Sequence, residues 1–344
     1  MDHIDLRSDT VTLPTPAMRA AMAAAPLGDD VYGEDPSVNR LQELAAERLG
    51  KEAGLFVASG TMGNLAAVLA HCGRGDEVIL GNQSHMFLNE AGGISALGGV
   101  HSCQIPNQPD GSLALEDIRA AIREVDPHHP PTRLVALENT QNLCGGTALT
   151  PDYSTAVGEL AHAAGLSLHL DGARLFNAAA ALGVDARLLA QPADSVTFCL
   201  SKALCAPVGS VLCGSQAFIA RAHRARKQLG GAMRQAGVLA AAGIVAIERM
   251  VERLVEDHAR AQCLAHGLAG VPGLVLDPGT PHTNMIFMNL SPEVNLAATQ
   301  VAQRLAAHGV LVGVSGTRRF RLVTHYWIDD QAVSRTVAAF GAVL

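Results

Sequence analysis

The stretches LSLHLDGAR (residues 166–174) and SVTFCLSKALCAPVGSV (195–211) decide how this chain is interpreted. Each begins as a largely apolar run of strand length and then reaches a charged side chain, Asp171 in the first and Lys202 in the second. Because an ammonium group is costly to bury, Lys202 needs a reason to stand among apolar neighbours. In open α/β sheets the active site lies beyond the carboxyl ends of the strands, where both residues fall.

Short β-rich runs alternate with amphipathic helical stretches along most of the chain, which predicts an α/β fold with a largely parallel sheet and helices on both faces. Strands are predicted at 54–58, 77–81, 100–106, 133–139, 166–171, 194–200 and 210–214. Further on, the pattern is helical from Gly231 to about residue 268. A separate α+β unit then follows, with predicted elements at 284–290, 295–309 and 319–325. We expect a large domain over residues 1–250, which includes an N-terminal arm, and a small domain over 251–344.

Composition narrows the class of protein. A formal net charge of −7 argues against an extended basic surface for nucleic acid, and the basic run RAHRARK (221–227) is expected to be the solvated face of a helix. The amino terminus shows no signal-peptide pattern, and the apolar stretch 236–247 is too short to span a membrane. Seven cysteines without a CxxC pair predict free thiols in a reducing cytoplasm.

Lysine is scarce in this chain: only Lys51, Lys202 and Lys227 occur beside 22 arginines. Lysine can form an imine and arginine cannot, so the retention of lysine at 202 favours covalent chemistry there. Asp171 could simply cap the following helix. Alternatively, its carboxylate could keep a pyridinium nitrogen protonated while Lys202 carries the same ring as a Schiff base, the arrangement that pyridoxal 5'-phosphate (PLP) requires.

Several other residues have both a structural and a functional interpretation. FVASGTMGNL (56–65) runs from a strand into a helix, where its backbone N–H groups could bind an anion or simply be capped. His85 could lie flat against a cofactor ring or be a surface-loop histidine. Arg174 and Arg321 suit binding of a carboxylate, although structural ion pairs are the commoner fate of such arginines. The adjacent His128 and His129 lack matching ligands, so no metal site is predicted.

With these residues in place, the chain closely resembles the low-specificity L-threonine aldolases from residue 4 to about 326. These are PLP enzymes with the aspartate-aminotransferase-like fold, in the group that includes the β-eliminating lyases. The resemblance rests on seven motifs in order: IDLRSDTVT, GDDVYGEDPSVNRL, SGTMGN, LHLDGARLFNA, CLSKALCAPVGS, MRQAGVLAAAG and RLVTH.

The resemblance implies a role for each candidate residue. Lys202 would form the Schiff base with PLP, and Asp171 would pair with the pyridine nitrogen. His85 would stack on the ring. The remaining roles are phosphate binding by Gly60 and Thr61, and binding of the substrate carboxylate by Ser8, Arg174 and Arg321. Arg174 and Arg234 count among the cofactor-binding residues.

The resemblance also implies an assembly. Tyr32 and Arg234 would reach the active site of a neighbouring subunit, which implies at least a dimer and usually a homotetramer built from two dimers. The chain departs from its relatives at Ala203, Ala232 and Gln141, and these departures bear on substrate preference more than on reaction type.

The expected reaction is reversible retro-aldol cleavage of L-threonine, L-allo-threonine and related β-hydroxy-α-amino acids to glycine and an aldehyde. His85 and His128 are the candidate bases for the β-hydroxyl proton, with His128 favoured for contact with the hydroxyl and His85 for stacking. The alternative hypothesis is that the same scaffold catalyses β-elimination, decarboxylation or transamination. A non-catalytic protein with the PLP fold would be expected to lose the lysine, the partner of the ring nitrogen or a carboxylate-binding arginine.

Overall fold

The computed structural model describes residues 3–344, in which the chain forms two compact units. One unit spans Pro14–Val251, and the other joins Glu252–Leu344 to the described residues that precede Pro14. The N-terminal arm, which the sequence assigned to the large domain, therefore groups with the C-terminal unit. The reason is that β1 (Ile4–Leu6) pairs in parallel with β11 (Val310–Val314) in one sheet.

The larger unit holds a seven-stranded sheet with the order β2-β8-β7-β6-β5-β3-β4. The antiparallel pairs are β2 with β8 and β8 with β7, and the other neighbours pair in parallel. Each strand ends within one residue of its predicted limits, and the predicted α/β class with a mostly parallel sheet is confirmed. The strands are β2 (Ala53–Val57), β3 (Glu77–Gly81), β4 (His101–Ile105), β5 (Thr132–Glu138), β6 (Ser167–Asp171), β7 (Ser195–Cys199) and β8 (Ser210–Gly214).

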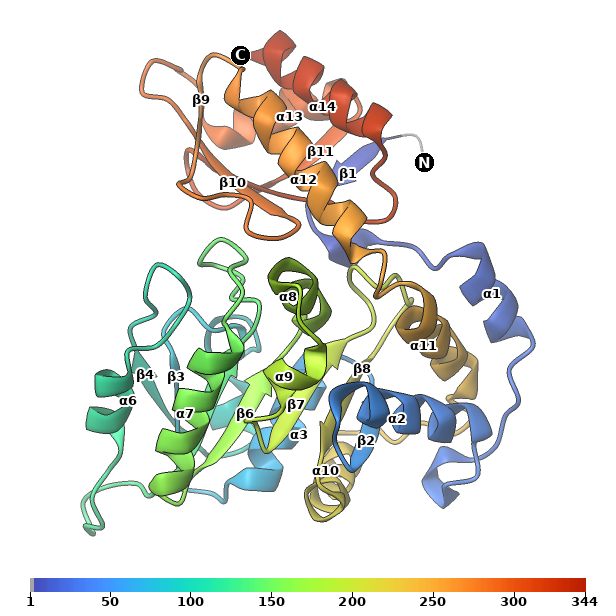
Figure 1. Cartoon of the computed structure of the whole chain (residues 1–344), viewed down its shortest axis with the longest axis vertical. Helices are drawn as coiled ribbons and strands as arrows, with labels where there is room; N and C mark the ends of the chain where they lie inside the picture. The colour runs from blue at the N-terminus through green and yellow to red at the C-terminus, as the bar shows by residue number, and fades with distance from the viewer. Residues whose placement is uncertain (1–2) are drawn as a thin grey trace. The chain divides into compact units, whose positions relative to one another are not determined.

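Helices cover both faces of this sheet, with α3 and α10 packed together on one face and α2, α7 and α9 on the other (Figure 1). None of the helices within residues 3–344 combines the length and the apolar character that crossing a membrane requires. The helices of the larger unit are α1 (Pro16–Ala23), α2 (Pro36–Leu49), α3 (Gly60–His71), α4 (His85–Leu88), α5 (Gly93–Ala96), α6 (Leu115–Ala121), α7 (Pro151–Ala163), α8 (Leu175–Leu182), α9 (Ala186–Ala190), α10 (Gln216–Gln228) and α11 (Gly237–Arg249), with the 3₁₀ turn η2 (Asp30–Tyr32).

Glycines in the first turn of α3 let this helix lie directly on β7. A Cβ atom at Gly63 would come within 2.7 Å of Thr197 Cγ2, and one at Gly60 would come within 3.0 Å of Cys199 Sγ. Ser59 caps the same turn by accepting a hydrogen bond from a backbone N–H of the helix. The start of α3 is therefore held against the carboxyl end of β7, close to the site that the sequence singled out.

The smaller unit is a five-stranded sheet with the order β1-β11-β12-β10-β9. Strands predicted at 284–290 and 319–325 appear as β10 and β12. The predicted helical stretch after Gly231 is not continuous. The first helix, α11, begins only at Gly237, and a short non-helical segment separates it from α12 (Leu254–Ala269). The remaining elements are β9 (Leu274–Leu276), β10 (Met285–Leu290), β12 (Arg319–Val323), α12 (Leu254–Ala269), α13 (Ala298–Ala307), α14 (Asp330–Val343) and the 3₁₀ turn η1 (Asp9–Val11).

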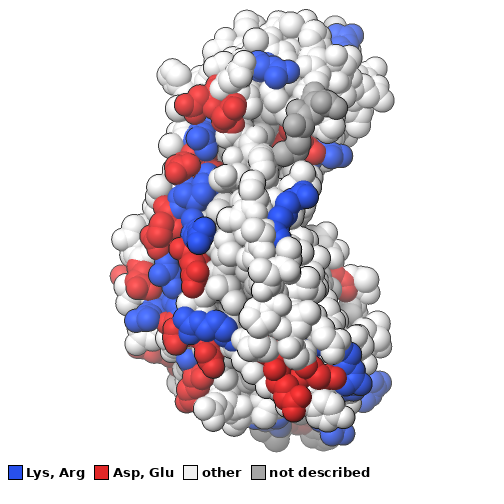
Figure 2. Space-filling model, turned by 90° about the vertical axis from the view of Figure 1, so that its right-hand side faces the viewer, with Lys and Arg blue, Asp and Glu red and all other residues white. Residues whose placement is uncertain are grey.

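The basic run at 221–227 forms part of α10, but it is not uniformly solvated as expected. Arg226 is 1% exposed, bonds Asp30 at 2.8 Å and donates to the carbonyl oxygen of Phe56 at 2.8 Å. Burial of an arginine requires such partners, and the interior position of Arg226 on the helix supplies them. On the face shown in Figure 2, Lys and Arg are interspersed with Asp and Glu.

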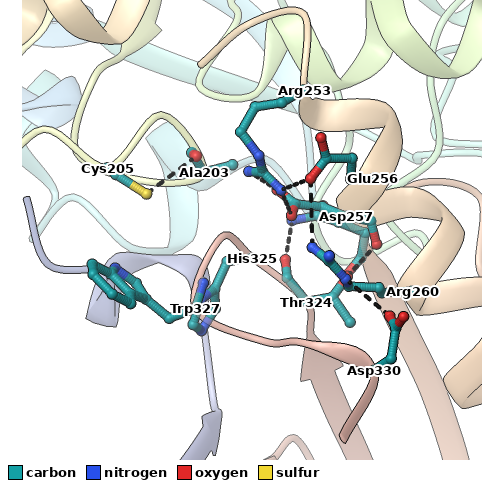
Figure 3. A network of polar contacts seen from close by, with 11 residues as sticks. Ala203, Cys205, Arg253, Glu256, Asp257, Arg260, Thr324, His325, Trp327 and Asp330 are labelled. Carbon is teal, nitrogen blue, oxygen red and sulfur yellow. Dashed lines mark hydrogen bonds and ion pairs between the residues drawn. The ribbon is translucent and has the colours of Figure 1, made fainter. Parts of the chain in front are cut away.

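The smaller unit buries the Asp257 carboxylate beside Arg253, which also contacts Glu256 at 3.4 Å (Figure 3). Arg253 makes two contacts with the Asp257 carboxylate, at 2.5 and 3.1 Å, and the Asp257 side chain is fully buried. The Thr324 hydroxyl donates to the Asp257 carbonyl oxygen at 2.6 Å. Burial raises the pKa of Asp257, and the Arg253 guanidinium opposes that rise.

Candidate active site

Asp171 lies at the carboxyl end of β6 and is 2% exposed. Its Oδ1 accepts a hydrogen bond from the backbone N–H of Ala173 at 3.1 Å, and its Oδ2 accepts one from Asn64 Nδ2 at 2.8 Å. The N-cap position of α8 belongs to Arg174, so Asp171 does not cap that helix. The carboxylate is instead held between a turn and α3.

His85 begins α4, shortly after β3 ends, and its side chain is half-buried. Its Nδ1 lies 2.8 Å from Glu90 Oε1, and Asn64 Nδ2 donates to the same oxygen at 2.9 Å. Nitrogen and carboxylate oxygen atoms of His85, Glu90 and Asp171 all lie within 4.8 Å of one another, a spacing that could also suit a metal ion. Since the amide of Asn64 donates to both carboxylates, we interpret the group as a hydrogen-bonded cluster.

Glu138, at the end of β5, joins this cluster and was missed by the sequence analysis. Its Oε2 accepts from the backbone N–H of His85 at 2.6 Å, and its Oε1 accepts from the N–H of Asn142 at 2.9 Å. The side chain therefore ties the segment after β3 to the segment after β5. A charged residue that ends an apolar strand, the signal that singled out Asp171, would also have found Glu138.

The electrostatics of the cluster disfavour further negative charge. Burial raises the pKa of Glu138 to about 7, with the charge of Asp171 as the second cause. Burial also raises the pKa of Glu90, whereas the hydrogen bond to Glu90 raises the pKa of His85. A cation placed among these carboxyl groups would be stabilised by all of them.

Lys202 lies in the turn that follows β7 and is half-buried. Its charge opposes the rise in the pKa of His85, so the ammonium group is close enough to act on the cluster. β6 and β7 are parallel neighbours, with Asp171 opposite Thr197. The carboxyl ends of both strands therefore meet at one edge of the sheet, as the sequence predicted for Asp171 and Lys202.

Three more candidate residues lie in the same unit as this cluster. Gly60 and Thr61 form the first turn of α3, whose backbone N–H groups are suited to an anion. Arg174, 7% exposed, follows Asp171 by three residues.

Gln141, one of the positions at which the chain departs from its relatives, has a structural role at the carboxyl edge of the sheet. It is fully buried, its Nε2 donates to the carbonyl oxygen of Gln83 at 2.9 Å, and its Oε1 accepts from the N–H of Cys144 at 2.7 Å. The residue therefore supports the segment that leads into His85.

His128 does not join the cluster, contrary to expectation. It precedes the amino end of β5, whereas Glu138 stands at the carboxyl end, roughly 20 Å away along the strand. Its side chain is 86% exposed, and its Nδ1 bonds Asp126 at 2.7 Å. Proximity to a strand in the sequence did not reveal at which end of the sheet this residue lies.

Tyr32 and Arg234, predicted to face a neighbouring subunit, lie near each other on the surface. Tyr32 is 76% exposed, and the guanidinium of Arg234 bonds Asp29 at 3.1 Å. The backbone N–H of Asp30 also donates to the carbonyl oxygen of Arg234 at 3.1 Å. Tyr32 and Arg234 therefore lie on two exposed segments of the larger unit that contact each other.

Ser8 and Arg321 both belong to the smaller unit. Ser8 caps η1 by accepting a hydrogen bond from the N–H of Thr10 at 3.3 Å. Arg321, on β12, donates to the carbonyl oxygen of Arg7 at 3.3 Å. Ser8 therefore lies in the N-terminal arm of this unit, and Arg321 bonds Arg7, the residue of the arm that precedes Ser8.

Comparison with known proteins gives consistent matches over the whole chain. Low-specificity L-threonine aldolase 1 of Arabidopsis thaliana is 49% identical, covering 99% of this chain and 96% of that protein. The low specificity L-threonine aldolase of Escherichia coli K12 is 45% identical, covering 99% of both.

Solved structures show the same fold. A threonine aldolase of Leishmania major superposes with a TM-score of 0.83 at 22% identity, covering 99% of this chain and 100% of that one. A structure of SPT with PLP superposes with a TM-score of 0.76 at 19% identity, covering 99% and 87%. The model of the beta-eliminating lyase family matches residues 5–291. This chain belongs to the beta-eliminating lyase family.

Proposed function

We propose that this protein is a PLP-dependent aldehyde-lyase that cleaves L-threonine, L-allo-threonine and related β-hydroxy-α-amino acids reversibly to glycine and an aldehyde. The observation that carries the proposal is the buried Asp171 carboxylate beside His85, with Lys202 close enough to influence that imidazole. The names of the relatives that match nearly the whole chain, low-specificity L-threonine aldolases, support the reaction.

The residues at this edge of the sheet fit PLP. A protonated ring nitrogen facing Asp171 would supply the cation that the raised pKa values of Glu90 and Glu138 favour. Lys202 would hold the cofactor covalently, and His85 would lie against the ring. The backbone N–H groups of Gly60 and Thr61 would hold the phosphate. When bound, PLP supplies an electron sink for the bond broken at Cα of the substrate.

The protein side chains then position the substrate and move its proton. We assign the substrate carboxylate to Arg174, whose guanidinium suits bidentate binding. Glu90 holds Nδ1 of His85, which leaves Nε2 as the atom that accepts the proton of the β-hydroxyl group. The hydrogen bond with Glu90 raises the pKa of His85, which makes the imidazole a stronger proton acceptor.

The remaining predicted roles extend this proposal. Ser8 and Arg321 would add contacts to the substrate carboxylate, and Tyr32 and Arg234 would serve the site of a second copy in a homo-oligomer, a tetramer of two dimers. All seven cysteines are free thiols, which supports a location in the reducing cytoplasm.

The test combines one product assay with one variant. Purified protein supplied with PLP is expected to release acetaldehyde and glycine from L-threonine. Lys202→Arg keeps the charge but cannot form an imine, so turnover should fall by roughly 10³-fold or more. Lys227→Arg on the exposed part of α10 is the matched control and should retain turnover. Full activity in Lys202→Arg would refute the assignment.

The same assay separates the rival reaction. Release of pyruvate from L-serine without aldehyde from L-threonine would identify a β-eliminating enzyme, which the matched family also allows.

A further inference from the structure

A line of polar side chains, buried except for the half-buried His71, lies between α3 and the sheet of the larger unit. Asn64 and His71 stand seven residues apart on α3, which places them on one face of the helix. His169 and Asp171 stand two residues apart on β6, so their side chains lie on the same face of the sheet. Ser195 of β7 pairs with His169 in the register of the two strands. These spacings align the side chains between Asp171 and the far end of α3.

Asn64 links this line to the carboxylates of the candidate active site. Its Nδ2 donates to Asp171 at 2.8 Å and to Glu90 at 2.9 Å, so both amide hydrogens are used. The opposite orientation would turn the amide oxygen toward two carboxylates and is excluded by repulsion. Asn64 Oδ1 therefore faces His169 Nε2, at 3.1 Å, and must accept a hydrogen from it.

This orientation determines the tautomer of His169. Burial lowers the pKa of His169 to about 3, so the ring is neutral and carries one hydrogen, on Nε2. Its Nδ1 must then accept, and the group 2.8 Å away is the hydroxyl of Ser195. Ser195 therefore donates its only hydrogen to His169.

His71 completes the line at the far end of α3. Its Nε2 lies 2.8 Å from Ser195 Oγ, and burial lowers the pKa of His71 to about 4, so this neutral ring donates through Nε2–H. The ring stacks on Phe218 with centroids 4.5 Å apart. It also lines an open pocket of about 430 Å³ at the side of the sheet where β6 and β7 begin. Each hydrogen bond of the line thus points toward Asp171.

We propose that His71, Ser195, His169 and Asn64 form a positioning relay, the α3 relay, which locks the amide of Asn64 with both hydrogens toward Asp171 and Glu90. The relay orients the Asp171 carboxylate through neutral hydrogen-bond donors and adds no charge of its own. As a consequence, which rests on the proposed function, the relay strengthens the hold of Asp171 on the ring nitrogen of PLP. None of the four residues is a catalytic residue in this proposal.

The first test reads the tautomers of the relay and does not depend on the cofactor. Long-range ¹H–¹⁵N correlation spectra of cofactor-free protein labelled with ¹⁵N-histidine should show His169 and His71 neutral at pH 7, with the hydrogen on Nε2 of both. His169→Gln and His71→Gln assign the signals. A hydrogen on Nδ1 of His169, or a doubly protonated ring, would overturn the relay.

The second test follows PLP binding along the relay. Asn64→Leu should raise the dissociation constant for PLP most, Ser195→Ala by roughly tenfold, and His71→Phe by less, because each variant breaks the line farther from Asp171. His71→Phe retains the ring that stacks on Phe218, and His71→Gln retains a donor and should rescue binding. His162 lines the same pocket but lies outside the relay, so His162→Gln serves as the control.

A second readout separates positioning from general damage. With PLP labelled with ¹⁵N at the ring nitrogen, the parent protein should show a protonated nitrogen, and Asn64→Leu should shift the signal toward the unprotonated form. Melting temperatures of the cofactor-free variants report folding. Ser195→Ala that binds PLP no more weakly than His162→Gln would contradict the relay. Failure of the parent to bind PLP would instead contradict the proposed function, while the tautomers would still decide the relay.

Discussion

The two compact units bury carboxyl groups in different ways. In the smaller unit Asp257 faces the guanidinium of Arg253 through two contacts, so a permanent cation inside the protein balances its charge. In the larger unit Glu138 is bonded by backbone N–H groups and Glu90 by an amide and a titratable imidazole. Burial raises the pKa of carboxyl groups in both places.

The difference separates a structural ion pair from a site that favours an added cation. A carboxylate with a dedicated arginine has its partner in the folded chain, and removal of either charge leaves the other uncompensated. Carboxyl groups held only by N–H donors and a histidine are best stabilised when a ligand brings a positive charge. The contrast predicts opposite effects of acid-to-amide substitutions in the two units.

Asp171→Asn should have the largest effect. The amide can no longer hold a protonated ring nitrogen, and its NH₂ group would face the donor of Asn64, so turnover should fall by roughly 10²–10³-fold. Steady-state kinetics with L-threonine measure the loss. Turnover within a factor of a few of the parent would remove Asp171 from the site.

Asp257→Asn should act on stability instead. The substitution removes the fully buried anion of Arg253, whose other carboxylate contact, Glu256 at 3.4 Å, is half-exposed, and it should cost about 3 kcal/mol of unfolding free energy. Denaturant unfolding of the cofactor-free protein measures the cost, and the kcat of the surviving folded enzyme should be unchanged. A shift in stability below about 0.5 kcal/mol would show that solvent already screens the pair.

Histidines buried in the neutral form should make the protein sensitive to acid. The pKa of His169 is about 3 in the folded protein and 6.5 in the unfolded chain, so only the unfolded chain takes up a proton between these values. The stability that the protein gains from a neutral His169 is complete above pH 6.5 and is lost as the pH falls toward 3. His169→Gln should therefore make stability fall less steeply below pH 6.5, by up to about 1.4 kcal/mol per pH unit. An unchanged slope would contradict a neutral His169.

Glu90→Gln should have the smallest effect, with a sign opposite to that of Asp257→Asn. The pKa of Glu90 is raised in the folded protein, so its ionisation removes stability as the pH rises above 4.5. The amide oxygen of Gln can still accept from Asn64 and His85. We expect the cofactor-free variant to be more stable at pH 7 by about 1 kcal/mol, with weaker PLP binding. Destabilisation in calorimetry would contradict the contrast between the units.

The sequence predicted the central sheet well because its strands have distinctive patterns. β3 and β7 are buried on both faces and appear as continuous apolar runs. β1 and β9 have only three residues each, too few for a period to be recognised. The pairing of β1 with β11 joins segments from opposite ends of the chain, which local patterns do not reveal.

The candidate site could be predicted only where strand direction was clear. Asp171 ends β6 and Lys202 follows β7, and both lie at the carboxyl edge. His128 precedes β5 and so lies at the other edge, an ambiguity that strand direction would have resolved. Glu138 escaped notice although it ends an apolar strand. The role of Asn64 depends on the packing of α3 against β6, which no local motif encodes.

The most direct test of the account is to find where PLP attaches. Protein incubated with PLP and reduced with borohydride should carry the phosphopyridoxyl group on the peptide that contains Lys202. The chain has only two other lysines, Lys51 and Lys227, so peptide mass spectrometry gives an unambiguous answer. Attachment at Lys202 in the parent, and its loss in Lys202→Arg, is the predicted result; label on Lys51 or Lys227 alone, or no label at all, would contradict the account.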